Sequence, residues 1–214
     1  GGQTVTITGT AFTDVSNVTF GGTDATFTVN GSTSITATTP ARMASGTVVV
    51  IIWTSGVGGA SLATGTANDY TYVDVPTVSA INPQVGPSTG GTTVVITGTN
   101  LTGATAVKFG ATNATSFTVN SSTQITATAP ARAAGQIDIS VTTPGGISDT
   151  TGTGDNYTFF DAPTVTSLSP SSGPAAGGTT VVITGANFSS ASAVNFGLAA
   201  AASFTVNKIG RAHV

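Results

Sequence analysis

The segment Ile81–Leu101 reads INPQVGPSTGGTTVVITGTNL, and its second half recurs along the chain. GGQTVTITG begins at Gly1, and GGTTVVITG begins at Gly90 and again at Gly177. Self-similarity at a fixed period indicates that each period folds as one structural unit. The period is about 87 residues, which is long enough for each unit to form a small domain of its own.

Two further pairs of segments define where the repeats begin and end. PTVSAINPQVGPSTGG begins at Pro76 and PTVTSLSPSSGPAAGG at Pro163, while NDYTYVDVP begins at Asn68 and DNYTFFDAP at Asp155. These matches predict three domains: residues 1–74, which lack the first strand, residues 75–161, which form a complete repeat, and residues 162–207, which form a truncated third repeat.

The repeats are predicted to consist of β-strands. In Thr93–Thr97, Val94 and Ile96 alternate with polar or exposed positions, and residues 136–142 alternate in the same way with Ile137, Ile139 and Val141 facing inward. The chain contains 44 threonines and no glutamate, a composition that favours strands over helices. Gly and Pro mark the turns between the strands. Half-buried strands at this spacing form a sandwich of two sheets.

Four motifs resemble the IPT/TIG family, a group of immunoglobulin-like domains found in plexins and certain transcription factors. They are Ile81–Leu101, Val107–Gly110 (VKFG), Ile125–Pro130 (ITATAP) and Asp155–Phe159 (DNYTF). The resemblance implies an all-β fold of tandem immunoglobulin-like sandwiches of the E-set type. It implies no catalytic motif, and members of the family bind DNA, proteins or carbohydrates, or space other domains apart.

Composition excludes several classes of function. The chain has no cysteine, and its one histidine lies in the last seven residues, so the usual nucleophiles and general bases are missing. The net charge is −3 and the pI is near 4.5, which disfavours nucleic-acid binding because phosphate contacts require clusters of Lys and Arg. The longest strongly apolar run, Val48–Trp53, is too short to cross a membrane. We therefore expect a segment that is not an enzyme, binds no nucleic acid and inserts into no membrane.

The last seven residues, KIGRAHV (208–214), depart from the repeat. Phe-Thr-Val-Asn begins at Phe27, Phe117 and Phe204, but only the first two copies continue with a Thr-rich stretch ending in Pro-Ala-Arg. The last six residues back-translate to ATC GGA AGA GCA CAC GTC, one reading frame of a widely used short-read sequencing adapter. We expect residues 208–214 to be an artefact of sequencing that interrupts the third repeat.

No cofactor is predicted, and calcium is the only metal worth considering. Asp69 and Asp74 flank one end of a repeat, and Asp155 and Asp161 flank the other. Carboxylates at such junctions could share a calcium ion, which prefers oxygen ligands. The alternative is that these residues are ordinary turn residues that keep the protein in solution.

One strand departs from the repeat in a way that suggests a contact surface. When Gly46 is aligned with Gly135, the outward positions occupied by Asp138, Ser140 and Thr142 become apolar, and an outward apolar stripe is often a contact site. The stripe consists of Val49, Ile51 and Trp53. It could contact a protein, or Trp53 could stack on a sugar ring. Alternatively, a loop or a neighbouring domain covers the stripe, or a bulge shifts the register.

Three functions remain open. The first is a stalk or adhesion segment of a larger bacterial surface or secreted protein, which would place the chain outside the cell or on its surface. The short Asp-x-Pro joints at Asp74 and Asp161 favour such a semi-rigid array, whose partners are other domains of the same chain and a protein or polysaccharide ligand. The second is an accessory module of a secreted polysaccharide-degrading enzyme. The third, a DNA-binding regulator, is disfavoured by the charge.

Overall fold

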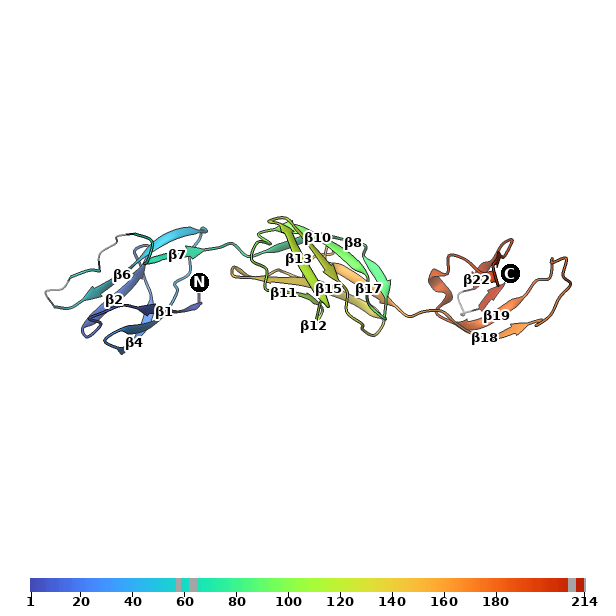
Figure 1. The fold of residues 1–214 in the computed structure, drawn as a ribbon, viewed down its shortest axis with the longest axis horizontal. Coiled ribbons are helices and arrows are strands. Elements are labelled where there is room, and N and C mark those ends of the chain that lie inside the picture. The colour runs from blue at the N-terminus through green and yellow to red at the C-terminus, as the bar shows by residue number, and fades with distance from the viewer. Residues whose placement is uncertain (57–58, 62–64, 208–210, 214) are drawn as a thin grey trace. The chain divides into compact units, whose positions relative to one another are not determined.

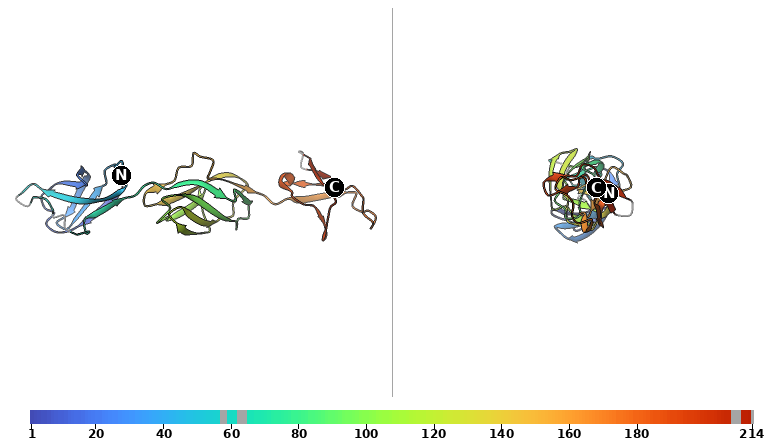
Figure 2. Two further views of the ribbon diagram at one scale, coloured as in Figure 1. Left: turned by 90° about the horizontal axis from the view of Figure 1, so that it is seen from above. Right: turned by 90° about the vertical axis from the view of Figure 1, so that its right-hand side faces the viewer.

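The computed structural model describes residues 1–56, 59–61, 65–207 and 211–213 of the chain (Figure 1). The chain forms two compact units, one of Gly1–Pro76 with Thr142–Ile147 and one of Thr77–Val141 with Ser148–Val214. In the described residues the regular elements are strands except for one short 3₁₀ helix, η1 (Phe188–Ser190), which confirms the predicted all-β class (Figure 2). None of these residues belongs to a helix long and apolar enough to cross a bilayer.

The second repeat forms two sheets. One has the strand order β13-β14-β10-β8, and the other has the order β12-β11-β15-β17-β9, with β16 paired to β15. The strands are β8 (Thr77–Asn82), β9 (Val85–Pro87), β10 (Thr93–Thr99), β11 (Ala106–Phe109), β12 (Thr112–Asn113), β13 (Ser116–Ser121), β14 (Gln124–Thr128), β15 (Gly135–Thr143), β16 (Gly146–Ile147) and β17 (Asn156–Phe160). The two sheets enclose one hydrophobic core, so this repeat is the sandwich that the sequence predicts.

The register of β10 explains the alternation in its sequence. Ile96 lies opposite Ile125 on β14 and opposite Ile81 on β8, so these three side chains share one face of the sheet. Side chains two residues apart on a strand point the same way, and Val94 is accordingly as fully buried as Ile96. Val95, on the other face, is only half-buried.

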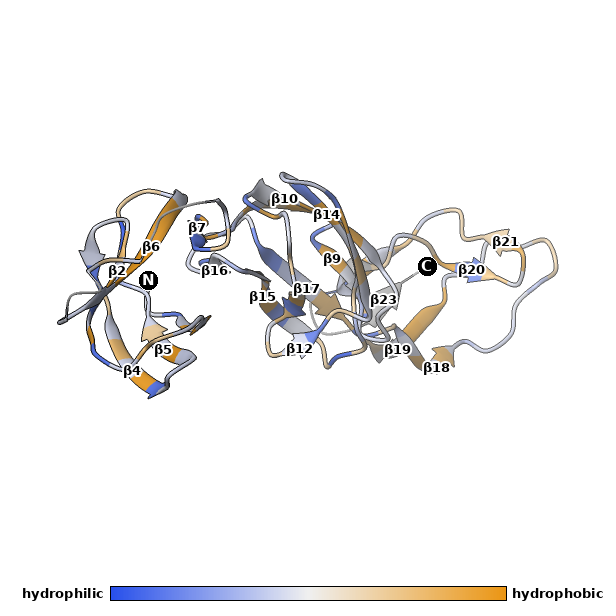
Figure 3. Ribbon diagram, turned by 60° about the vertical axis from the view of Figure 1, so that its left-hand side comes forward, coloured by the Kyte–Doolittle hydropathy of each residue, from blue (hydrophilic) through white to orange (hydrophobic). Residues whose placement is uncertain are grey.

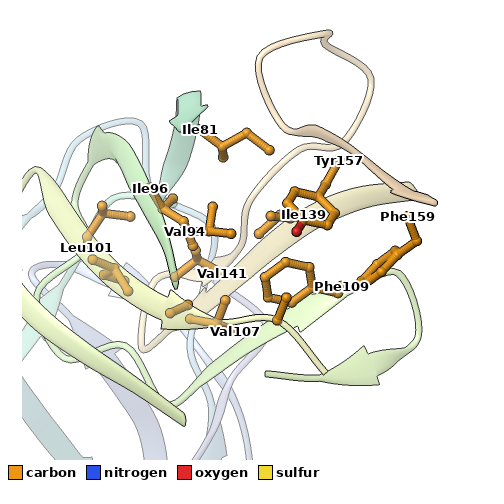
Figure 4. Packing of buried hydrophobic residues seen from close by; sticks show 13 residues of the cluster. Ile81, Val94, Ile96, Leu101, Val107, Phe109, Ile139, Val141, Tyr157 and Phe159 are labelled. Atoms are coloured by element: carbon orange, nitrogen blue, oxygen red, sulfur yellow. The ribbon is translucent and has the colours of Figure 1, made fainter. Parts of the chain in front are cut away.

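The core of the second repeat is built around three aromatic rings (Figure 4). The ring of Tyr157 lies edge-on to Phe109 and Phe159, with centroids 5.4 Å and 4.9 Å away, an arrangement that aromatic pairs prefer. Aliphatic side chains from both sheets and from the loops after β10 and β14 fill the remaining space: Ile81, Val94, Ile96, Leu101, Val107, Ile125, Ala127, Ala129, Ile139 and Val141.

The first repeat contains the same two sheets with fewer strands. Their orders are β1-β5-β4 and β3-β2-β6-β7. The strands are β1 (Thr4–Thr8), β2 (Val15–Phe20), β3 (Thr23–Asp24), β4 (Thr26–Gly31), β5 (Ser34–Thr38), β6 (Gly46–Thr54) and β7 (Asp69–Tyr72). Among the described residues no strand plays the part of β8 beside β1. Ile7 on β1 is therefore only half-buried, whereas its counterpart Ile96 is fully buried.

The third repeat has a four-stranded sheet of order β18-β19-β23-β22 and a hairpin, β20-β21. Its strands are β18 (Thr164–Ser169), β19 (Val182–Ala186), β20 (Asn195–Phe196), β21 (Ala199–Ala200), β22 (Thr205–Asn207) and β23 (Arg211–His213). Its small core consists of Val181, Ile183 and Phe188.

The predicted adapter segment lies partly outside the described residues, which omit 208–210 and 214. Within it, β23 pairs with β19 and β22 in the position that β14 takes between β10 and β13. Main-chain pairing of this kind is open to nearly any sequence without proline, so the origin of residues 208–214 stays a prediction.

Candidate functional site

The candidate surface lies on β6, a strand that is apolar along most of its length (Figure 3). The residues on its core side are buried: Val48, Val50 and Ile52. On the opposite side, Val49 and Ile51 are half-buried and Trp53 retains 43% exposure. This is the alternation that the sequence predicts. We call the three outward residues the β6 face; its role as a contact surface stays a prediction.

Small and polar residues flank the β6 face. On β2, Asn17 lies opposite Trp53 and Thr19 lies opposite Ile51. On the other side of the strand, Ala60 forms a β-bridge with Trp53. A bulky neighbour would cover the indole, but Asn and Ala are too short to do so. The exposure of Trp53 therefore follows from the residues paired with it.

A polar pair stands next to Trp53, and the sequence alone does not reveal it. The Nδ2 of Asn17 donates a hydrogen bond of 2.7 Å to Oδ1 of Asp24, and the Oδ1 of Asn17 accepts one of 2.8 Å from the backbone N–H of Val18. Asn17 and Asp24 lie on adjacent strands, β2 and β3, whose short pairing gives no sequence pattern. Asn17 is one of three polar residues in β2, with Ser16 and Thr19, so its type does not single it out.

The β6 face thus presents an exposed indole and two half-buried aliphatic side chains, and the amide of Asn17 and the carboxylate of Asp24 lie beside it. An apolar surface with polar groups at one end can hold a flat ligand by stacking and hydrogen bonds, or an apolar patch of another protein. The equivalent positions of β15 carry Asp138, Ser140 and Thr142, so the second repeat has no such surface. The feature distinguishes the first repeat from the second.

The four acidic residues considered for calcium lie in different environments. Asp69, Asp74 and Asp161 are exposed, and Oδ2 of Asp74 accepts a hydrogen bond of 2.8 Å from Ser45 Oγ. Asp155 is only 1% exposed. In the part of the chain that the structure describes, no three His, Asp or Glu side chains come together where they could hold a metal ion. Calcium binding stays a prediction.

Comparison with known families gives one match. The model of the IPT/TIG domain matches residues 1–72, 76–160 and 163–208. The residues that carry the sequence motifs, from Ile81 to Phe159, fall within the second of these ranges. A comparison with curated protein sequences finds no match.

Solved structures with a similar fold include the full extracellular region of plexin A4, at 20% identity and a TM-score of 0.47, covering 100% of this chain and 19% of that one. A protein crystallised with a xylogluco-oligosaccharide is 21% identical with a TM-score of 0.36, covering 99% of this chain and 50% of that one. SGBP-B of the Bacteroides ovatus mixed-linkage glucan utilization locus is 18% identical with a TM-score of 0.30, covering 75% of this chain and 42% of that one. The chain thus spans half or less of each of these chains.

Proposed function

Because the chain belongs to the IPT/TIG domain family, we propose that its three tandem domains are a non-enzymatic spacer and adhesion segment of a larger bacterial surface or secreted protein. A spacer needs units that fold stably and joints that limit bending. The proposal rests on the joint between the first two repeats, whose family matches end at residue 72 and resume at residue 76.

This joint is short and is held by contacts within its own compact unit. Ser45 donates the hydrogen bond to the Asp74 carboxylate, and Pro76 is buried. The turn that follows β15 also lies against the joint, since a Cβ on Gly145 would overlap the main-chain oxygen of Asp74. Prolines and close packing restrict the backbone of a linker. These contacts support a stiff joint rather than a flexible tether.

The test is ¹⁵N relaxation of the amides in the first and second repeats. A stiff joint makes both repeats report the slow tumbling of one larger body. If each repeat instead tumbles at the rate of an isolated domain of about 87 residues, the joint is flexible and the spacer proposal fails.

A second candidate function, carbohydrate binding, is favoured by the β6 face alone. An exposed indole offers a flat apolar surface for a sugar ring, and Asn17 and Asp24 offer hydrogen-bonding groups beside it. Such binding would suit either a surface protein or an accessory module of a polysaccharide-degrading enzyme.

Trp53→Ala tests this candidate. With soluble xyloglucan and mixed-linkage glucan as probes, we expect about a two- to tenfold loss of affinity, because stacking on an aromatic ring is worth about 0.5–1.5 kcal/mol. Trp53 is the one tryptophan in the sequence, so the variant has no indole fluorescence, and the binding and stability of the wild type and both variants are measured by calorimetry. Phe160→Ala, at a comparably exposed aromatic residue (42%), is the matched control. Unchanged binding by Trp53→Ala, with only a loss of stability, would show that the indole is merely structural.

A further inference from the structure

Asp155 is an acidic residue in the core of the second repeat. It directly precedes β17 and is buried like Tyr157 and Phe159, which lie two and four residues further on and face inward. Among the described residues neither of its carboxylate oxygens has a hydrogen-bond partner, and both are buried. A buried carboxylate without a partner is strongly disfavoured, so the group requires an explanation.

The first repeat shows what this position accommodates. Asn68 occupies it there, because NDYTY aligns with DNYTF. The main chains match: Val50 donates its N–H to Asn68 O at 2.8 Å, and Ile139 donates its N–H to Asp155 O at 2.9 Å. In addition, Nδ2 of Asn68 donates a hydrogen bond of 3.2 Å to the carbonyl oxygen of Val50. A side chain at this position of the repeat therefore faces a main-chain carbonyl oxygen and can donate a hydrogen bond to it.

An ionised carboxylate cannot play the part of Asn68, because it only accepts hydrogen bonds, whereas a protonated carboxyl has one O–H to donate. The charges near Asp155 also favour its protonated form. Burial, the largest effect, raises the pKa of Asp155, and the negative charges of Asp138 on β15 and Asp149 after β16 raise it further, while the N–H of Asp155 itself lowers it. On β17, the strand that follows Asp155, Tyr157 contributes only a phenol, and the Ser79–Ala80 backbone that meets Gly154 carries no charge.

We propose that Asp155 keeps a proton in the folded second repeat and donates it to the carbonyl oxygen of Ile139, as Asn68 donates to Val50. Ionisation breaks this bond and leaves a buried charge. The second repeat is therefore a pH-sensitive element of the array, stable when Asp155 is neutral and weakened when the carboxyl ionises.

The sign of the pH dependence follows from proton linkage. The pKa of Asp155 is higher in the folded state than in the unfolded chain, so the folded state binds the proton more tightly. Its stabilising effect is complete below the unfolded pKa, near 4, and is lost as the pH rises through the folded pKa. Within that window the folding equilibrium constant falls at most about tenfold per pH unit, which lowers the unfolding midpoint by roughly 5–10 °C.

The experiment compares the whole chain with Asp155→Asn from pH 4 to pH 8, using amide exchange in β15 and β17 to follow the second repeat. We expect the wild type to lose protection as the pH rises and Asp155→Asn to keep it, with the two converging at low pH. At about pH 6, where exposed aspartates are ionised, infrared spectra should show the C=O stretch of a protonated carboxyl in the wild type and not in the variant. Exchange rates are corrected for their intrinsic pH dependence.

The reverse substitution provides a second test that does not depend on Asp155→Asn folding. Asn68→Asp should introduce the same pH dependence into the first repeat, followed by Trp53 fluorescence, and to a smaller extent because Asn68 is only half-buried. Parallel pH profiles of the wild type and both variants would overturn the proposal. So would stabilisation of the wild type, but not of Asp155→Asn, by added calcium at neutral pH, because the carboxylate would then be a cation ligand.

Discussion

At the scale of single residues, the contact between Gly86 and Tyr157 explains the glycine in the segment Pro83–Pro87 (PQVGP). Tyr157 is fully buried, and a Cβ on Gly86 would overlap its Oη and lie 2.5 Å from Oγ1 of Thr92. Only a residue without a side chain allows the β9 segment to pass over the ring. The glycine in this segment is thus required by an aromatic residue some seventy positions later in the chain.

Gly86→Ala should therefore destabilise the second repeat. Forcing a methyl group into a packed site costs about 1–3 kcal/mol, and the free energy of opening measured by amide exchange in β10 and β17 should fall by that amount. Gly31→Ala is the control, because a Cβ there meets nothing within 4 Å. Equal protection in the two variants would mean that Tyr157 does not pack against Gly86 in solution.

At the scale of elements, the strand β8 accounts for the difference between the first two repeats. It covers one edge of β10, and the described residues contain no equivalent strand beside β1. Ile96 and Ile7 occupy the same register, opposite Ile125 and Ile35, yet only Ile96 is fully buried. Because both residues are isoleucine in the same register, comparing Ile96 with Ile7 measures how burial alone affects stability.

Ile96→Ala should cost about 2–5 kcal/mol, the range for truncating a fully buried isoleucine, and Ile7→Ala should cost clearly less. The measurement is the free energy of opening at the amides of β14 and β5, each reporting on its own repeat. Equal losses would show that Ile7 is buried to the same extent as Ile96 in solution.

The sequence predicts those elements whose pattern is local. The alternation in β10 and β6 identifies the buried faces correctly, because period-two patterns record which side of a strand meets the core. It does not predict the parallel pairing of β9 with β17, since residues 85–87 and 158–160 are joined only through the tertiary fold. It also does not distinguish the buried Asp155 from the exposed Asp161, because both read as acidic residues near turns. Nor could it reveal the Asn17–Asp24 pair beside Trp53.

At the scale of the whole molecule, the chain is a tandem array of IPT/TIG domains, and we propose that it acts as a spacer. Only 6% of the residues are charged, and exposed Thr side chains on adjacent strands form hydrogen-bonded pairs, such as Thr77–Thr99 and Thr47–Thr71. The proposed spacer function requires that the joint at Asp74 be stiff.

The most direct test is a distance measurement by pulsed electron paramagnetic resonance between spin labels at Thr28→Cys and Thr118→Cys. Both residues are exposed and equivalent in their repeats, and the chain has no native cysteine. We expect one narrow distance distribution, which broadens when Gly145→Ala forces the turn away from Asp74 and is unchanged by Gly31→Ala. A broad distribution in the otherwise unaltered chain, unaffected by Gly145→Ala, would contradict the account, because the joint would then be a flexible tether.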